Sequence, residues 1–185
     1  SGPTKSIQTA VEHLNANGII AKLIPVSCAF HSSLIHKAEM YYKSFLDGVD
    51  FHKSLIPVWS NTTAGIYPKE IEKIKERLAE HIVKPVRFAD QIKAMEEQGA
   101  TVFIEVGAGN VLTGLVQDTI DKSHVAIHTD QKGQNGIKSL LSALAQYAAT
   151  GRSLTFQSLF EDRQVVALNL DDPGQYQLKP TVWSL

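Results

Sequence analysis

Cysteine is almost absent from this 185-residue sequence, and neither sign of charge dominates it. The single cysteine, Cys28, excludes an internal disulfide framework and a zinc site built from several thiolates. Lys and Arg number 18 against 19 Asp and Glu, and the resulting net charge of −1 argues against a nucleic-acid-binding protein. Apolar runs stay well short of the ~18 residues that a membrane-spanning helix needs, so we expect no membrane segment.

Hydrophobic residues, in contrast, make up 43% of the chain, which is enough to build the core of about one domain. The opening residues, Ser1 to Lys5, carry neither the apolar stretch nor the cleavage site of a signal peptide. The composition therefore predicts a soluble, cytoplasmic, globular chain.

Helix and strand patterns alternate over the first 150 residues. Apolar residues at helical spacing predict helices over 4–17, 34–48, 68–84, 89–98, 112–120 and 137–147. Runs rich in β-branched residues predict strands over 19–26, 56–60, 101–106 and 124–128. Thr4 is a plausible N-cap and Gly18 a plausible residue after the first helix. This alternation predicts an α/β fold with parallel strands and helices on both faces, followed by an extended arm over 153–185.

One histidine lies where α/β folds place reactive groups. His31 follows the apolar run 19–26 in the polar loop Cys28-Ala29-Phe30-His31-Ser32, and imidazole titrates near neutral pH. The alternative is an ordinary loop histidine. Cys28 and His31 could form a thiol–imidazole pair. The alternative is that Cys28 is a small buried hydrophobic residue at a strand end.

Two further patterns have a structural reading beside the functional one. His31, His36 and Glu39 are metal ligands by type, but a spacing of five residues does not place the two histidines on one helical face. The turn from Glu105 to Asn110 contains two glycines that could admit a phosphate to a helix N-terminus. Leu112 stands where the dinucleotide fingerprint needs a third glycine, so close packing of strand on helix explains the turn better.

Read together, four stretches resemble the C-terminal half of the acyltransferase (malonyl-CoA:acyl carrier protein transacylase) domains of modular polyketide synthases and related fatty-acid-type synthases. They are Pro-Val-Ser-Cys-Ala-Phe-His-Ser at 25–32, Pro-Val-Trp-Ser-Asn at 57–61, Lys-Pro-Val-Arg-Phe at 84–88, and Phe-Ile-Glu-Val-Gly-Ala-Gly-Asn-Val-Leu at 103–112. Their order and spacing fit the family over residues 1 to about 150. The last residues, with Pro180-Thr181-Val182-Trp183, resemble the linker that follows the acyltransferase in multidomain synthases.

The resemblance implies a role for each matching residue. His31 matches the general base that exchanges a proton with a nucleophilic serine and with the thiols of acyl-CoA and of phosphopantetheine. His81 matches a position whose main-chain carbonyl orients that base. Phe30, Cys28 and Asn61 match the substrate pocket, and the bulk of Phe30 implies malonyl over methylmalonyl. The chain itself is expected to bind no cofactor and no metal.

The family's nucleophile lies in a Gly-His-Ser-x-Gly elbow, and these 185 residues contain no Gly-x-Ser-x-Gly. The resemblance therefore implies a fragment. Residues 1–30 are a remnant of a ferredoxin-like small subdomain, 31–150 the C-terminal part of the α/β-hydrolase-like large subdomain, and 151–185 the linker arm. The expected partners are acyl carrier protein, malonyl-CoA, the missing N-terminal half and the adjacent ketosynthase and linker domains.

Two other functions stay open beside this one. The chain could be a noncatalytic scaffold of a megasynthase that docks neighbouring domains through residues 151–185. It could also be an independent hydrolase that uses Cys28 with His31.

Overall fold

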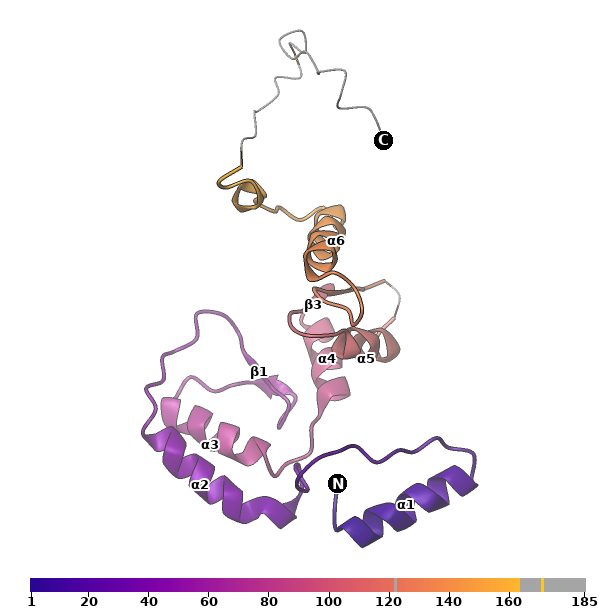
Figure 1. Cartoon of the computed structure of the whole chain (residues 1–185). Coiled ribbons are helices and arrows are strands. Elements are labelled where there is room, and N and C mark those ends of the chain that lie inside the picture. Colours follow the sequence, from indigo (N-terminus) through magenta and orange to yellow (C-terminus); the bar gives the residue numbers. More distant parts are fainter. Residues whose placement is uncertain (122, 164–170, 172–185) are drawn as a thin grey trace.

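The computed structural model describes residues 1–121, 123–163 and 171, and it has a mixed α/β fold (Figure 1). The helices are α1 (Thr4–Ala16), α2 (His36–Asp47), α3 (Ile71–His81), α4 (Phe88–Glu97), α5 (Val111–Thr119) and α6 (Gly136–Ala149). The strands are β1 (Trp59–Ser60), β2 (Gly65–Ile66), β3 (Val102–Glu105) and β4 (Val125–His128). Two single 3₁₀ turns, Ser33–Ile35 and Gln157–Leu159, complete the described elements.

Strands β3 and β4 are parallel, with Val102 opposite Val125 and Glu105 opposite His128, as the alternating pattern predicts. Helix α5 connects the two strands, and α5 and α6 cover opposite faces of the strand pair. Val125 lines a hollow with Gln146 of α6, whereas the next residue, Ala126, lines another with Val116 of α5. Because consecutive strand residues point to opposite faces, α5 and α6 lie on either side of the pair, as Figure 1 shows.

Helices α2 and α3 pack against each other, and in the view of Figure 1 α3 lies between α2 and the short antiparallel hairpin of β1 and β2. Leu46 of α2 and Ala79 of α3 are buried in this contact. The stem of Lys75 is buried as well, and its ammonium group donates a hydrogen bond to the Asp47 carbonyl at 3.2 Å. This hydrogen bond fixes the N-terminal half of α3 against the end of α2. The candidate site lies at the C-terminal end of α3.

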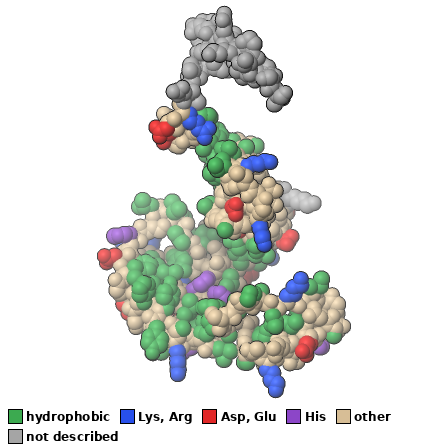
Figure 2. All heavy atoms as spheres, viewed as in Figure 1, with side chains coloured by type: hydrophobic (Ala, Val, Ile, Leu, Met, Phe, Trp, Pro, Cys, Tyr) green, Lys and Arg blue, Asp and Glu red, His purple; other side chains and the backbone are tan. Residues whose placement is uncertain are grey.

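The hydrophobic core is small for the apolar content of the chain. Within the described residues, the buried hydrophobic side chains are Leu46, Ala79, Ile92, Val116, Ile127 and Ala143. Many large hydrophobic side chains are exposed instead, including Leu55, which is 99% exposed, and Tyr41, which is 80% exposed. Figure 2 shows hydrophobic side chains gathered on the surface that the α2, α3 and β1 region forms. Exposed apolar area of this extent marks surfaces that bind other protein segments.

The predicted strand over 19–26 is wrong. The segment is extended, but none of the described residues pairs with it as a strand, and Ile20 is 85% exposed. Its backbone is instead tied to α1, where the Asn15 amide donates to the Ala21 carbonyl at 3.1 Å and accepts from the Ala21 N–H at 3.0 Å. Strand propensity reflects packing beside a neighbouring strand, which this segment lacks among the described residues.

Other predicted boundaries need smaller corrections. Thr4 is the first residue of α1 and not its N-cap, a position that Pro3 takes. Gly18 does follow the helix in a left-handed conformation, with φ of 78°, as predicted. The strand predicted over 56–60 is reduced to β1, and its hairpin partner β2 was not predicted. Helix α3 starts at Ile71, so Pro68 lies before its first turn.

The predicted arm over 153–185 lies largely outside the described residues, since 164–170 and 172–185 are not described. Residues 153–163 carry no structure beyond the turn Gln157–Leu159 and bends. None of the helices in the described part of the chain combines the length and the apolar composition needed to cross a membrane.

Glu105 caps the N-terminus of α5. Its carboxylate accepts hydrogen bonds from the N–H of Leu112 at 3.1 Å and from the N–H and hydroxyl of Thr113, both at 2.7 Å. Partial burial opposes the charged form of Glu105, but these hydrogen bonds and the nearby His128 outweigh it and lower the pKa of the carboxyl. The protein's own anion thus fills the helix N-terminus, which excludes the phosphate reading of the glycine turn.

We predict that Glu105→Gln lowers the free energy of unfolding at pH 7 by about 1–2 kcal/mol, since a charged cap is lost. Because the pKa of Glu105 is lowered on folding, its contribution is complete above the ordinary value and disappears as the pH falls through the lowered one. Denaturant unfolding at pH 7 and pH 3, followed by circular dichroism, measures both effects.

The matched control is Glu97→Gln at the exposed end of α4. An unfolding free energy for Glu105→Gln that equals that of Glu97→Gln at pH 7 would contradict the capping role.

Candidate active site

The loop before α2 holds His31 in a backbone conformation that its neighbours enforce. His31 has a φ of 61°, in the left-handed region that a residue other than glycine seldom adopts. Its N–H donates to the Ile82 carbonyl at 2.8 Å, and the Ser32 hydroxyl donates to the Ala29 carbonyl at 2.7 Å. These bonds fix the loop against the C-terminal end of α3, and the ring of His31 points to the same place.

The ring of His31 is oriented by two backbone carbonyls. Its Nδ1 lies 2.9 Å from the His81 oxygen and 3.1 Å from the Lys84 oxygen. A carbonyl oxygen can only accept, so Nδ1 carries the proton, and in the neutral imidazole Nε2 is then the nitrogen with the lone pair. Nε2 has no hydrogen-bond partner among the residues that the structure describes. The arrangement prepares Nε2 to take a proton from a hydroxyl or thiol.

The sequence explains why the His81 carbonyl is available. In a continuing helix it would accept from the N–H four residues later, but that residue is Pro85, which has no N–H. Helix α3 ends at His81, whose carbonyl is left for another donor, whereas the Glu80 carbonyl still accepts from the Lys84 N–H at 2.9 Å. These carbonyls also form the negative end of the helix dipole, which favours a positive charge on His31.

The side chain of His81 takes part in the same cluster. Its Nδ1 lies 3.2 Å from the Thr62 hydroxyl, and its ring meets that of His31 nearly perpendicularly, with centroids 5.4 Å apart. Burial, and after it the charge of His31, lowers the pKa of His81. The sequence analysis gave His81 a role through its carbonyl only. Thr62 was not singled out, although it stands next to Asn61 in a turn-rich stretch.

Asn61 lies in the turn that ties this cluster to α4. Its carbonyl accepts from the Arg87 N–H at 2.9 Å, and its side-chain Oδ1 is buried without a hydrogen-bond partner. Phe30 and Cys28 share the loop with His31; Phe30 is 45% exposed and Cys28 is exposed. The hydrogen bonds that gather His31, His81 and the 61–62 turn do not include Phe30 or Cys28.

The metal hypothesis on His31, His36 and Glu39 fails on geometry. His36 Nδ1 pairs with Glu39 Oε2 at 2.6 Å on α2, whereas His31 Nδ1 is directed at the α3 carbonyls. The thiol–imidazole pair gains no support either, because the described hydrogen bonds of His31 do not involve the Cys28 thiol. The reading of Cys28 as a small buried residue is also wrong, since it is exposed.

A second cluster of charged groups was missed by the sequence analysis. His124 Nε2 lies 3.4 Å from Glu96, and its Nδ1 lies 3.1 Å from Asp121. The three groups come within 4.8 Å of one another. Nε2 of His124 contacts the carboxylate of Glu96 and Nδ1 contacts that of Asp121, which is the geometry of two ion pairs. The only sequence signal was the spacing of three residues between Asp121 and His124.

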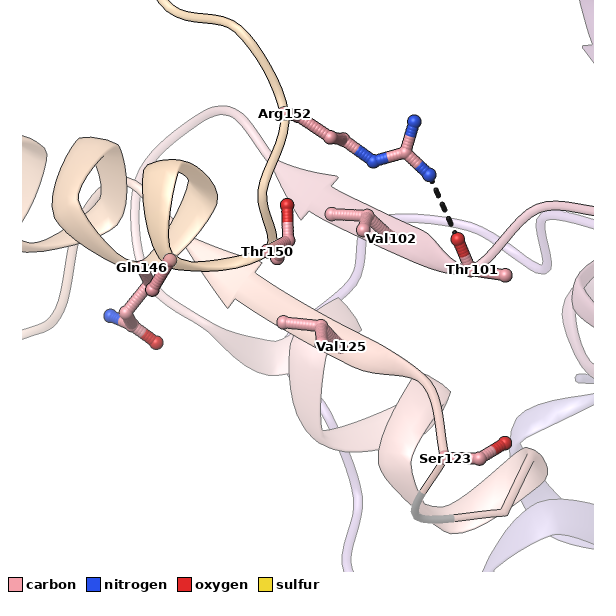
Figure 3. A pocket seen from close by; sticks show the side chains of 8 residues that line it. Thr101, Val102, Ser123, Val125, Gln146, Thr150 and Arg152 are labelled. Atoms are coloured by element: carbon pink, nitrogen blue, oxygen red, sulfur yellow. Dashed lines mark hydrogen bonds between the residues drawn. The ribbon is translucent and has the colours of Figure 1, made fainter.

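A cavity of about 440 Å³ lies at the amino ends of β3 and β4, and neither His31 nor His81 lines it. Figure 3 shows Val102, Val125, Ser123 and Gln146 around it, with Arg152 donating to the Thr101 hydroxyl at 2.8 Å. Hydroxyl, amide and apolar groups line it, and Arg152 brings the charge. It offers neither a base nor a nucleophile with an activating partner, so His31 and its neighbours form the candidate site.

Known proteins similar to this chain come from one family. The family described as acyl transferase domain matches residues 1–153. The malonyl CoA-acyl carrier protein transacylase of Bacillus subtilis is 40% identical over 119 residues. The alignment covers 63% of this chain and 37% of that protein.

Two solved structures are similar in fold. The acyltransferase domain from the second module of the salinomycin polyketide synthase is 26% identical, with a TM-score of 0.78 over 91% of this chain and 40% of that one. A malonyl-transacylase solved in complex with its type II polyketide synthase acyl-carrier protein is 26% identical, with a TM-score of 0.64 over 78% of this chain and 45% of that one. The chain therefore spans less than half the length of each of these relatives.

Proposed function

Because the chain belongs to the acyl transferase domain family, we propose that it supplies the general base of an acyl transfer between two thiols, with malonyl-CoA as donor and an acyl carrier protein as acceptor. The observation that supports the proposal is the contact of His31 Nδ1 with the carbonyls of His81 and Lys84, which selects the tautomer whose lone pair is on Nε2. The relatives' names give the substrate class, and the geometry gives the residue.

The nucleophile is a serine from outside these 185 residues. His31 Nε2 takes the proton of the serine hydroxyl, and the serine oxygen attacks the thioester carbonyl of the acyl-CoA. The carbon–sulfur bond breaks, and the departing CoA sulfur receives the proton from His31. In the second half, His31 accepts the proton of the carrier protein's phosphopantetheine thiol, whose sulfur takes the acyl group, and the proton returns to serine.

The backbone around His31 is suited to both halves of this cycle. The Nδ1 contacts hold the ring in one orientation while Nε2 alternates between protonated and free. The ring becomes positively charged each time it holds the serine or thiol proton. The two carbonyls and the C-terminal end of α3 stabilise that charge.

The segment that brings the serine also has to cover apolar surface. In the described part of the chain, the extended residues 19–26, Tyr41 and Leu55 all carry hydrophobic side chains in solvent. We assign this surface to the N-terminal half of the same domain, so that the chain corresponds to the C-terminal part of the α/β-hydrolase-like acyltransferase fold. Residues 1–30 then belong to the ferredoxin-like small subdomain, and 151–185 to the linker that leads to neighbouring domains such as the ketosynthase.

Phe30 precedes the base directly and is half-exposed, so its ring is available to line the acyl pocket. A ring at this position leaves room for malonyl and crowds a 2-methyl group. Cys28 and Asn61 complete the proposed wall, with the unpaired Oδ1 of Asn61 as a polar group buried behind it. The chain itself binds no cofactor in this scheme, since CoA and phosphopantetheine are parts of the substrates.

We predict that His31→Asn in the complete domain lowers the transfer of malonyl from CoA to carrier protein about 10³-fold, in the range for a lost general base. Asparagine tolerates the left-handed backbone of residue 31, so the loop is kept. The rate of appearance of malonylated carrier protein, read by mass spectrometry, checks it. The control is His13→Asn on the exposed face of α1. Unchanged transfer in His31→Asn would favour the noncatalytic scaffold instead.

The 185-residue chain alone is predicted to form no acyl-enzyme. Incubation with malonyl-CoA should leave its mass unchanged, because the base is present and the serine is not. Intact-mass spectrometry detects the increase that one malonyl group would cause. A stable malonyl adduct on a serine of this chain would refute the division of labour between the two halves, and iodoacetamide-sensitive hydrolysis would restore the Cys28 hypothesis.

Phe30→Ser should shift the choice of acyl donor in the complete domain. Removing the ring opens space for a methyl group, which is worth about 1–3 kcal/mol in a hydrophobic pocket. We expect kcat/KM for methylmalonyl-CoA relative to malonyl-CoA to rise about tenfold, measured with both donors in competition. The exposed residue Phe156, remote in sequence, gives the control Phe156→Ser. An unaltered ratio in Phe30→Ser would remove Phe30 from the pocket.

A further inference from the structure

His81 contacts the base twice, through its backbone and through its ring. The carbonyl accepts from His31 Nδ1 at 2.9 Å, while the ring lies edge-to-face with that of His31 at a centroid distance of 5.4 Å and an interplanar angle of 84°. The far side of the His81 ring is fixed by the hydroxyl of Thr62 at 3.2 Å. One residue therefore sets both the direction of the base's N–H bond and the wall beside the base.

A second imidazole at this distance affects the base according to its charge. If the His81 ring were protonated, the positive charge would oppose uptake of a proton by His31, and an interaction at this range changes such an equilibrium by about tenfold or more. A neutral ring has no such effect. Transfer requires His31 to become positively charged, so a neutral neighbour is the productive state.

We propose that the side chain of His81 is a positioning residue for His31: anchored on Thr62, its ring holds the carbonyl–imidazole contact in place and couples the protonation of the two histidines. The inference rests on the proposed role of His31 as the base. It adds a function for the side chain to the one that the main-chain carbonyl has.

The charged groups around His81 do not replace His31 in this coupling. Helix α3 and the residues after it contribute Arg77, Glu80 and Lys84. In the turn that contains Thr62, the guanidinium groups of Arg77 and Arg87 donate to Thr63. The loop before α2 contributes Cys28 and His31. Among these groups it is His31 whose charge, after burial, lowers the pKa of His81, and a lowered pKa favours the neutral His81 ring.

The direct test is a titration of the full 185-residue chain by nuclear magnetic resonance of the histidine rings. The His81 signal, assigned by its loss in His81→Gln, should titrate below the ordinary value of 6.5. Its midpoint should move upward in His31→Asn and stay unchanged in His13→Asn. A nuclear Overhauser contact between the rings of His31 and His81 should be present and should weaken in Thr62→Val, which keeps both rings and removes the anchor.

The second readout is the pH dependence of transfer by the complete domain. At low pH both imidazoles acquire protons, so the acid side of the rate profile should approach a slope of two and fall to one in His81→Gln, whose side chain cannot charge. His81→Lys, which carries a charge at every pH tested, should lose at least tenfold in kcat at pH 7 relative to His81→Gln. Circular dichroism of each variant confirms folding.

The outcomes separate this inference from the proposed function. A His81 midpoint at or above 6.5, or one indifferent to His31→Asn, overturns the coupling whatever the enzyme's activity. An unchanged slope in His81→Gln, with His31→Asn inactive, overturns the coupling and keeps His31 as the base. Active His31→Asn would refute the proposed function, although the titration would still report the contact between the rings.

Discussion

The hydrogen bond from His31 Nδ1 to the carbonyl of His81 is the contact on which the site depends. It fixes the tautomer and the direction of the ring, and it exists because Pro85 leaves that carbonyl without its helical donor. The unusual φ of His31 is stabilised at the same helix end, because the His31 N–H donates to the carbonyl of Ile82, the residue after His81. The end of α3, Pro85 and the strained loop at His31 together determine where the lone pair of His31 Nε2 points.

The two parts of the fold contribute differently to this site. The histidine cluster is built from the loop before α2, which carries His31, from the end of α3, which carries His81, and from the β1–β2 turn, which carries Thr62. The β3–β4 unit with α4, α5 and α6 carries no member of that cluster, but Arg87, at the start of α4, is hydrogen-bonded to the Asn61 turn through its N–H. In the glycine turn before α5, the Glu105 carboxylate occupies the helix N–H groups that a phosphate would need.

Local patterns predicted the helices and the β3–β4 pair to within a few residues, because apolar periodicity and β-branched runs are properties of neighbouring residues. The strand over 19–26 failed because its composition satisfies strand propensity while a pairing strand is absent from the described residues. The ring of His81 on Thr62 escaped notice because 19 residues separate them, and the Glu105 cap because its bond crosses a turn. The carbonyl role of His81 came from family resemblance, although the spacing from His81 to Pro85 contains its physical cause.

The β3–β4 sheet has one further consequence. Among the described residues it consists of two parallel strands, and each has a neighbour on one side only. Parallel sheets are normally enclosed, and an open row of backbone donors and acceptors readily recruits strands from other chains. Co-expression with a segment that pairs with those edges is therefore expected to raise the soluble yield of this polypeptide.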